Sequence, residues 1–173
     1  ISRGHKIIHS ESGLITIVGG KWTTYREMSK DVINDAIENH NLKRSPSKTK
    51  SLSIHGNIST NEKLGLNGVL WVYGSDAKQL MKLTETDASY KNKLHHNYEY
   101  TVGQVIWSAR YEMARTVEDV LARRFRLLFL DAQVSIDIAE KVANILQKEL
   151  NKTEDWKQNQ IEEFTTLAKG YLI

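Results

Sequence analysis

The sequence predicts a mainly α-helical protein that begins with a β-hairpin. Apolar residues recur at helical spacing in several stretches after residue 22, most regularly between residues 101 and 168. Residues 6–18 contain instead two short extended runs joined by Glu11-Ser12-Gly13, which is typical of a tight turn. With 40% hydrophobic and 26% charged residues over 173 positions, the composition is that of a globular protein with a real core.

The N-terminal part is predicted to pair residues 6–10 with residues 14–18 as antiparallel strands. A long helix should follow from Trp22 to about His40, with an apolar stripe along one face. Residues 43–50 contain the only proline and alternate Ser, Lys and Thr, which indicates a linker. We therefore predict a hairpin-plus-helix region over residues 1–42, a linker over residues 43–50 and a helical domain over residues 51–173.

The start of the helical domain carries weaker patterns. Residues 51–56 have the composition of a short strand, and a weak helix is expected near Asn61. Val69 to Tyr73 is an apolar run that ends at Gly74. Ser75 should cap a helix over residues 76–83, because its hydroxyl can accept a hydrogen bond from the first turn.

The remaining helices are marked by their caps. A helix is predicted over residues 101–113, and Thr116 with Asp119 should cap a shorter one over residues 117–124. Asp131 and Thr153 should cap the last two helices. The spacing of the charges also predicts a ladder of Arg115, Asp119 and Arg123 on one helix face. We expect four or more helices to pack around a core that contains Ile106, Val142, Leu146 and Phe164.

Candidate chemistry is concentrated where the second strand meets the first helix. Gly19-Gly20 frees the backbone there, Lys21 adds a positive charge, and Trp22, Thr23 and Thr24 begin the helix. The N–H groups and positive dipole end of a helix attract electron-rich groups. The alternative is an ordinary strand-to-helix turn with a solvated lysine, in which the threonine hydroxyls act only as N-caps.

Two blocks also resemble a known family. Residues 12–28, SGLITIVGGKWTTYREM, resemble the last FAD-contacting segment of the FAD-dependent glycerol-3-phosphate dehydrogenases. Residues 112–132, EMARTVEDVLARRFRLLFLDA, resemble the signature of the C-terminal helical domain of that family. The blocks occur in the family's order. The sequence lacks the family's G-x-G-x-x-G motif for the FAD pyrophosphate, so the resemblance implies the C-terminal part of such an enzyme, in which residues 1–42 are left over from the FAD-binding domain.

The resemblance implies an activity for the parent enzyme. It would oxidise sn-glycerol 3-phosphate to dihydroxyacetone phosphate by hydride transfer to FAD, and would pass the electrons to a quinone. Gly19, Gly20, Lys21, Trp22, Thr23 and Thr24 would contact the FAD. Lys21 would stabilise negative charge on the reduced flavin or bind the substrate, and Arg3 would lie near the substrate, although Gly4 stands where the family has Asp. An oxidase that uses O2 is the alternative.

The resemblance also bears on partners. Because most of the flavin site would lie upstream, the piece alone is expected to be inactive and to hold no FAD. It is expected to act as a cap or interaction domain whose partner is the rest of the flavin domain. A homodimer is another expected partner. The absence of cysteine fits a cytoplasmic protein. No apolar run reaches the ~20 residues of a membrane span, and we expect the parent to be peripheral on the cytoplasmic face of the inner membrane.

Two other classes of site are disfavoured by the sequence. There is no cysteine, and His95-His96 is a pair of adjacent residues that face apart, so no metal site is predicted. Residues 101–124 have the outline of a helix-turn-helix with the basic run Arg123-Arg124-Phe125-Arg126, which is the argument for a nucleic-acid-binding module. Nearby acidic residues and a net charge of only +3 argue against that class.

Overall fold

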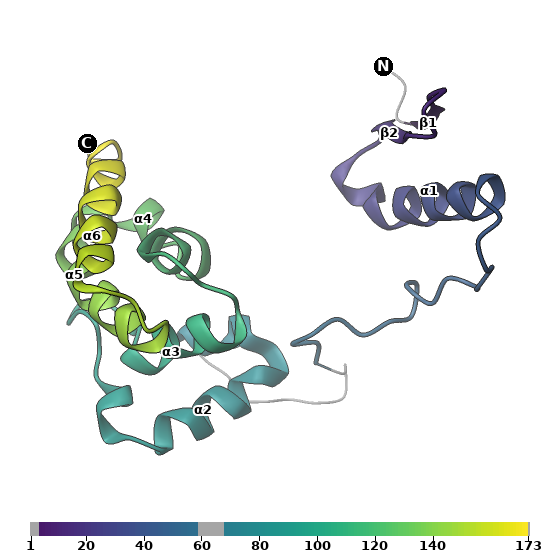
Figure 1. Cartoon of the computed structure of the whole chain (residues 1–173). Helices are drawn as coiled ribbons and strands as arrows, with labels where there is room; N and C mark the ends of the chain where they lie inside the picture. The colour runs from purple at the N-terminus through teal and green to yellow at the C-terminus, as the bar shows by residue number, and fades with distance from the viewer. Residues whose placement is uncertain (1–3, 59–67, 173) are drawn as a thin grey trace. The chain divides into compact units, whose positions relative to one another are not determined.

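The computed structural model describes residues 4–58 and 68–172. The protein is mainly α-helical with one N-terminal hairpin, as the sequence predicts (Figure 1). It divides into two compact units, Ile1–Ile54 and His55–Ile173, and each is described by itself. Arg3 and the helix expected near Asn61 lie outside the described residues.

The first unit begins with a two-stranded antiparallel sheet. Strand β1 (His5–His9) pairs with β2 (Ile15–Gly19), and Ile7 lies opposite Ile17. The turn is fixed by Ser10, whose hydroxyl oxygen accepts the N–H of Leu14 at 3.0 Å. The strands begin and end within one residue of the predicted bounds, because alternation and turn residues are local signals.

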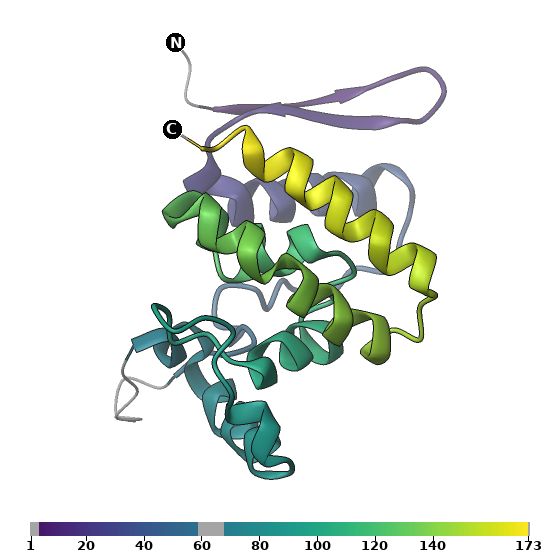
Figure 2. The same ribbon diagram turned by 90° about the vertical axis from the view of Figure 1, so that its left-hand side faces the viewer.

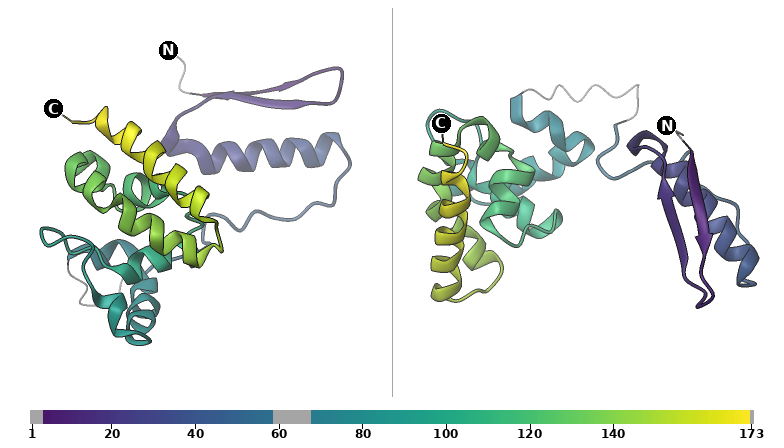
Figure 3. Two further views of the ribbon diagram at one scale, coloured as in Figure 1. Left: turned by 60° about the vertical axis from the view of Figure 1, so that its left-hand side comes forward. Right: turned by 90° about the horizontal axis from the view of Figure 1, so that it is seen from above.

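The hairpin lies along helix α1 (Tyr25–Asn39), as Figure 3 shows. Two histidines of β1 reach carboxylates of α1: His5 Nε2 is 3.1 Å from Asp31 Oδ2, and His9 Nε2 is 2.9 Å from Asp35 Oδ1. The 3₁₀ turn η1 (Trp22–Thr24) precedes α1, so the predicted helix start at Trp22 is a tighter turn than expected. Because the unit is thin, no residue of α1 is fully buried.

The junction into the second unit corrects two predictions. Residues 51–56 form no strand, because the Gly56 carbonyl accepts the N–H of Ser75 at 3.0 Å instead of pairing in a sheet. Ser75 lies inside the 3₁₀ segment η2 (Gly68–Asp76) and does not cap α2 (Ala77–Glu85). Gly74, at φ +53°, is required there, since a Cβ would lie 1.9 Å from the Gly56 oxygen.

The remaining described elements are the four helices predicted after residue 100 and two short helices, at residues 88–91 and 127–130, that the sequence does not predict. They are η3 (Ala88–Lys91), α3 (Val102–Tyr111), the π-helix η4 (Asp119–Arg124), α4 (Leu127–Leu130), α5 (Ala132–Glu149) and α6 (Glu154–Lys169). Helices α5 and α6 lie side by side (Figure 2).

Both predicted caps of the last two helices are confirmed. Asp131 Oδ1 accepts the N–H of Val134 at 3.0 Å, and Thr153 Oγ1 accepts that of Trp156 at 3.2 Å. These bonds satisfy first-turn donors that have no partner within the helix.

The core of the second unit is formed by α3, η4, α4, α5 and α6. Val142, Leu146 and Phe164 belong to it as predicted. Ile106 is buried, but it lies outside this cluster, and Val105 and Ala109 face it instead. Helix α3 is buried on nearly all sides, so its apolar pattern alone does not indicate which face meets the core.

Candidate functional site

The glycine pair predicted as a cofactor contact lies at the end of β2. Gly19 and Gly20 have φ of +82° and +76°, which side chains rarely adopt. A Cβ on Gly19 would lie 2.9 Å from the Gly4 carbonyl oxygen, and one on Gly20 would lie 2.3 Å from Met28 Sδ. The main chain of β1 therefore already requires Gly19, whereas at Gly20 the positive φ is the reason for glycine, because the flexible Met28 side chain could move.

The segment after the glycines presents donors to solvent. Thr24 Oγ1 accepts the N–H of Lys21 at 3.0 Å and donates to the Lys21 carbonyl at 2.9 Å, which fixes the turn. The Lys21 and Thr23 side chains are exposed, and Trp22 is 89% exposed. Within the described residues, the N–H groups of Trp22 and Thr23 donate no hydrogen bond. Two backbone donors, a cation and an aromatic ring thus stand together at the start of a helix.

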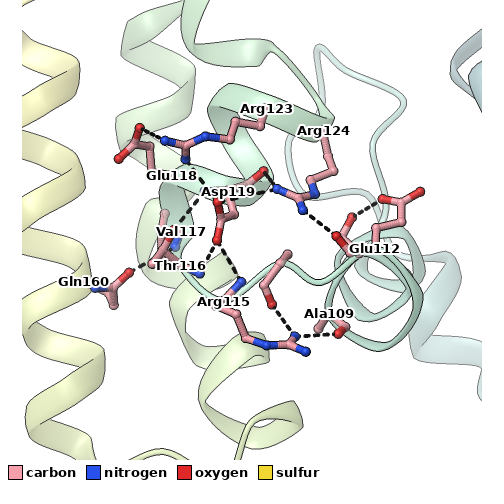
Figure 4. A network of polar contacts seen from close by, with 12 residues as sticks. Ala109, Glu112, Arg115, Thr116, Val117, Glu118, Asp119, Arg123, Arg124 and Gln160 are labelled. Atoms are coloured by element: carbon pink, nitrogen blue, oxygen red, sulfur yellow. Dashed lines mark hydrogen bonds and ion pairs between the residues drawn. The ribbon is translucent and has the colours of Figure 1, made fainter. Parts of the chain in front are cut away.

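A second polar arrangement lies in the block of residues 112–132, and the sequence predicts only part of it. Asp119 Oδ2 accepts the N–H groups of Arg115 and Thr116 at 2.9 and 3.1 Å, and Thr116 Oγ1 accepts the N–H of Asp119 at 3.0 Å (Figure 4). This reciprocal cap is the predicted one. The helix that it starts begins at Val117 and continues as the π-helix η4, a rare form of helix.

The predicted charge ladder is correct for one arginine and wrong for the other. Arg123 reaches Asp119 Oδ1 at 3.1 Å and Glu118 Oε1 at 2.7 Å. The Arg115 guanidinium leaves the ladder and donates to the carbonyls of Ala109 and Ala114 at 2.9 Å. The Ala109 carbonyl is in the last turn of α3 and lacks a partner within the helix, so it accepts from this cation, while the Asp119 carboxylate already accepts two main-chain N–H groups.

Arg124, on the π-helix, also binds main-chain carbonyl groups. It donates to the carbonyls of Asp119 and Glu112, and its Nη1 lies 3.5 Å from Asp119 Oδ1. Sequence spacing could not reveal these bonds, because they join the end of α3 to a later turn. The block is also tied to α6, since Gln160 Oε1 accepts the N–H of Val117 at 3.2 Å (Figure 4).

A pocket of about 230 Å³ adjoins this network and is lined by Val72, Tyr73, Glu112 and Arg124. Burial raises the pKa of Glu112 above its usual value, against the opposing effect of hydrogen bonds from Ser108 and Trp107. Burial also raises the pKa of the Tyr73 hydroxyl, which accepts a hydrogen bond from Gln104 Nε2 at 3.3 Å. Both side chains serve as internal hydrogen-bond partners in this arrangement.

Comparison with known proteins places the chain in a family. Residues 12–159 match the model of the C-terminal domain of alpha-glycerophosphate oxidase. The chain belongs to this family. The match contains both the Gly19–Thr24 segment and the network around Asp119.

Individual relatives extend over almost the whole chain. The mitochondrial glycerol-3-phosphate dehydrogenases of Macaca fascicularis and Homo sapiens are each 35% identical over 191 aligned residues, which cover 99% of this chain. The enzyme of the same name from Schizosaccharomyces pombe is 29% identical over 98% of the chain. The chain spans 26% of the length of the first two relatives and 31% of the third.

The described residues contain no cluster of three or more His, Asp or Glu side chains that could hold a metal ion. Among the helices of residues 4–58 and 68–172, none combines the length and apolar character needed to cross a membrane.

Proposed function

We propose that this chain is the C-terminal part of an FAD-dependent glycerol-3-phosphate dehydrogenase, which oxidises sn-glycerol 3-phosphate to dihydroxyacetone phosphate. The observation that carries the proposal is the alignment of nearly the whole chain with about a quarter of each mammalian dehydrogenase. Residues 1–42 are then part of the flavin domain, residues 43–50 are the linker, and residues 51–173 form a helical cap without catalytic groups.

The segment Gly19–Thr24 fits one wall of a flavin site in chemical terms. Its glycines keep the main chain open, and its exposed N–H groups can donate to the carbonyl edge of an isoalloxazine ring. The FAD, when bound, supplies the acceptor for the hydride from C2 of the substrate. The residues of this chain would bind and orient the FAD, and Lys21 would place a positive charge where negative charge develops on the reduced flavin.

Lys21 has two roles compatible with its place. Its ammonium can stabilise charge on the reduced cofactor, or it can pair with the phosphate or hydroxyl of the substrate. We propose the first, because the same turn directs two backbone donors to solvent beside the lysine. Arg3 as a second substrate contact rests on the family resemblance alone.

The electron acceptor distinguishes a dehydrogenase from an oxidase. The matching family model is described by an oxidase, whereas the relatives aligned over almost the whole chain are named dehydrogenases. We therefore propose a dehydrogenase that passes electrons to a quinone, and keep an oxidase that uses O2 as the alternative. The relatives' names place them in mitochondria. That the parent enzyme is peripheral on the cytoplasmic face of an inner membrane is a proposal that rests on the family resemblance.

The proposed partner of this chain is the upstream part of the flavin domain. The two-stranded sheet has open edges, and Ile8 and Val18 of its strands are 43% and 45% exposed. Further strands and apolar side chains would cover these surfaces. A homodimer remains part of the proposal. A nucleic-acid role is disfavoured because Arg123 and Arg124 are engaged within the protein.

The test uses the longer protein that contains this chain, with its FAD content checked first. It should reduce a quinone analogue when glycerol 3-phosphate is added, and failure to do so would refute the proposed function. Lys21→Met keeps much of the length of the side chain and removes its charge, and should lower kcat by ~10²–10³ if the charge acts in the transition state. Lys6→Met is the control, because Lys6 is exposed on β1 outside the segment.

Other kinetic outcomes identify other roles for Lys21. A rise in KM at constant kcat would indicate that Lys21 binds the substrate equally in the ground and transition states. Unchanged kinetics in a fully FAD-loaded variant would show that Lys21 is a solvated surface residue. Its substitution would then change the free energy of unfolding by less than ~0.5 kcal/mol.

A further inference from the structure

The segment of residues 43–50 has features that the proposed function does not use. It reads KRSPSKTK, all of it is exposed, and residues 43–48 have no regular secondary structure. Pro46 fixes its own φ and disfavours helix at Ser45. Ser45 is therefore a hydroxyl in an accessible, non-helical stretch of chain, directly followed by proline.

This segment folds back on α1 and forms a pocket of about 400 Å³ with it, inside the first unit. Ser45 and Lys48 line the pocket from the segment, and Arg26 and Lys30 line it from α1. The apolar part of the wall consists of Tyr25, Ile33, Leu52 and Ile54. A serine hydroxyl and three cations therefore share one cavity.

The charge of the cavity is only partly balanced. Glu27 Oε1 accepts from Lys30 Nζ at 2.7 Å, and its Oε2 accepts from Arg26 Nη2 at 3.1 Å. The hydrogen bond from Lys30 lowers the pKa of the Glu27 carboxyl, so Glu27 is ionised at neutral pH. With Lys48 included, the group keeps a net of two positive charges. A phosphate monoester carries about −1.5 to −2 at pH 7, which would neutralise them.

We propose that Ser45 is a phosphorylation site for a proline-directed protein kinase, and that Arg26, Lys30 and Lys48 bind the attached phosphate. In the transfer, Ser45 Oγ forms a bond to the γ-phosphorus of ATP, while the bond from that phosphorus to the β–γ bridging oxygen breaks. ADP leaves with the bond's electron pair, and the hydroxyl proton passes to the kinase's catalytic aspartate.

The neighbouring hydroxyls are less suitable acceptors. Ser47 Oγ and Thr49 Oγ1 are hydrogen-bonded to each other at 3.0 Å, and neither residue precedes a proline. Within the described residues, the Ser45 hydroxyl makes no hydrogen bond. The chemistry of the site thus distinguishes Ser45 from the other two.

The consequence is a switch in the linker. In the unmodified chain the segment and α1 line the same pocket. A phosphate bound by α1 cations would add charge-assisted hydrogen bonds between them. Phosphorylation should therefore fix residues 45–54 against α1. The inference does not depend on the identity of the reaction or of the cofactor.

The test begins with the 173-residue chain, a purified proline-directed serine kinase and MgATP. Mass spectrometry should find one phosphoryl group on Ser45, none in S45A, and the same modification in S47A. A synthetic peptide of residues 41–52 shows that the kinase is active. Modification of the peptide without modification of Ser45 in the folded chain would overturn the proposal, as would transfer to Ser47 or Thr49.

The second measurement asks whether the phosphate meets the cations of α1. The second pKa of the phosphoserine, ordinarily about 6, is measured by ³¹P NMR and should fall by about half a pH unit or more beside these cations. The double variant R26Q/K30Q should restore the value found in the phosphorylated peptide without changing the kinase's target sequence. K6Q, which removes a cation outside the pocket, should retain the shift. A phosphoserine with the same pKa in the chain, in R26Q/K30Q and in the peptide would overturn the proposed contact.

Discussion

Replacing Asp119 with alanine should destabilise the second unit more than the replacement of an ordinary surface carboxylate. Asp119 Oδ2 accepts the main-chain N–H groups of Arg115 and Thr116 at 2.9 and 3.1 Å. Oδ1 lies 3.1 Å from Arg123 Nη1 and 3.5 Å from Arg124 Nη1. The side chain is 22% exposed, so these bonds are partly shielded from water.

The magnitude follows from the kinds of bond that are lost. Hydrogen bonds to a charged group contribute about 1.5–3 kcal/mol each, and the exposed pair with Arg123 adds less than about 1 kcal/mol. Water can replace part of the cap once the carboxylate is gone. We expect Asp119→Ala to lower the free energy of unfolding by about 2–4 kcal/mol. Asp119→Asn keeps one acceptor oxygen and should cost about half as much.

The assay is urea unfolding of the full chain followed by circular dichroism. Asp137→Ala is the matched control, because Asp137 lies exposed on α5, and it should change the free energy by less than about 0.5 kcal/mol. A loss for Asp119→Ala as small as that of the control would refute the assignment of Asp119 as the organising acceptor.

Lowering the pH should remove the stabilisation that the ionised Asp119 carboxylate provides. Burial alone would raise the pKa of Asp119, but the N–H groups of Arg115 and Thr116 and the charge of Arg124 outweigh it and hold the pKa low. A lowered pKa in the folded state gives stability that is present above the unfolded value of about 3.9 and is lost as pH falls through the folded pKa. The difference in stability between the native chain and Asp119→Asn should therefore shrink below about pH 4.

Three further outcomes are expected. Leu146→Ala should cost about 2–5 kcal/mol in urea unfolding, because Leu146 is fully buried in the core; a loss below about 1 kcal/mol would contradict that packing. Burial raises the pKa of Glu112, so the free energy of unfolding should decline as pH rises from about 4 through the folded pKa. Glu112→Gln should flatten this part of the plot of urea midpoint against pH, and an unchanged slope in the variant would contradict the raised pKa. The 173-residue chain alone should bind FAD weakly or not at all and purify colourless, whereas stoichiometric flavin absorbance would show that Gly19–Thr24 is not merely one wall of the site.

The sequence by itself determined the features that depend on neighbouring residues. The hairpin, the order of the helices and the caps at Thr116, Asp131 and Thr153 follow from turn residues, periodicity and short hydroxyl or carboxylate reach. The Gly19–Thr24 segment was also recognised in this way, since strand, glycines and helix start are consecutive. Its role in the enzyme stays a prediction.

Only the tertiary structure decided which distant groups meet. The Gly56 carbonyl accepts the N–H of Ser75, which does not form its expected cap. The carbonyls of Ala109 and Ala114 accept from the Arg115 guanidinium, which does not join its expected ladder. Arg124 joins the π-helix to Glu112 through bonds that no sequence spacing encodes. The physical reason is the same in each case: an unpaired backbone group in a partly buried place must find a partner, and the fold determines which side chain can reach it.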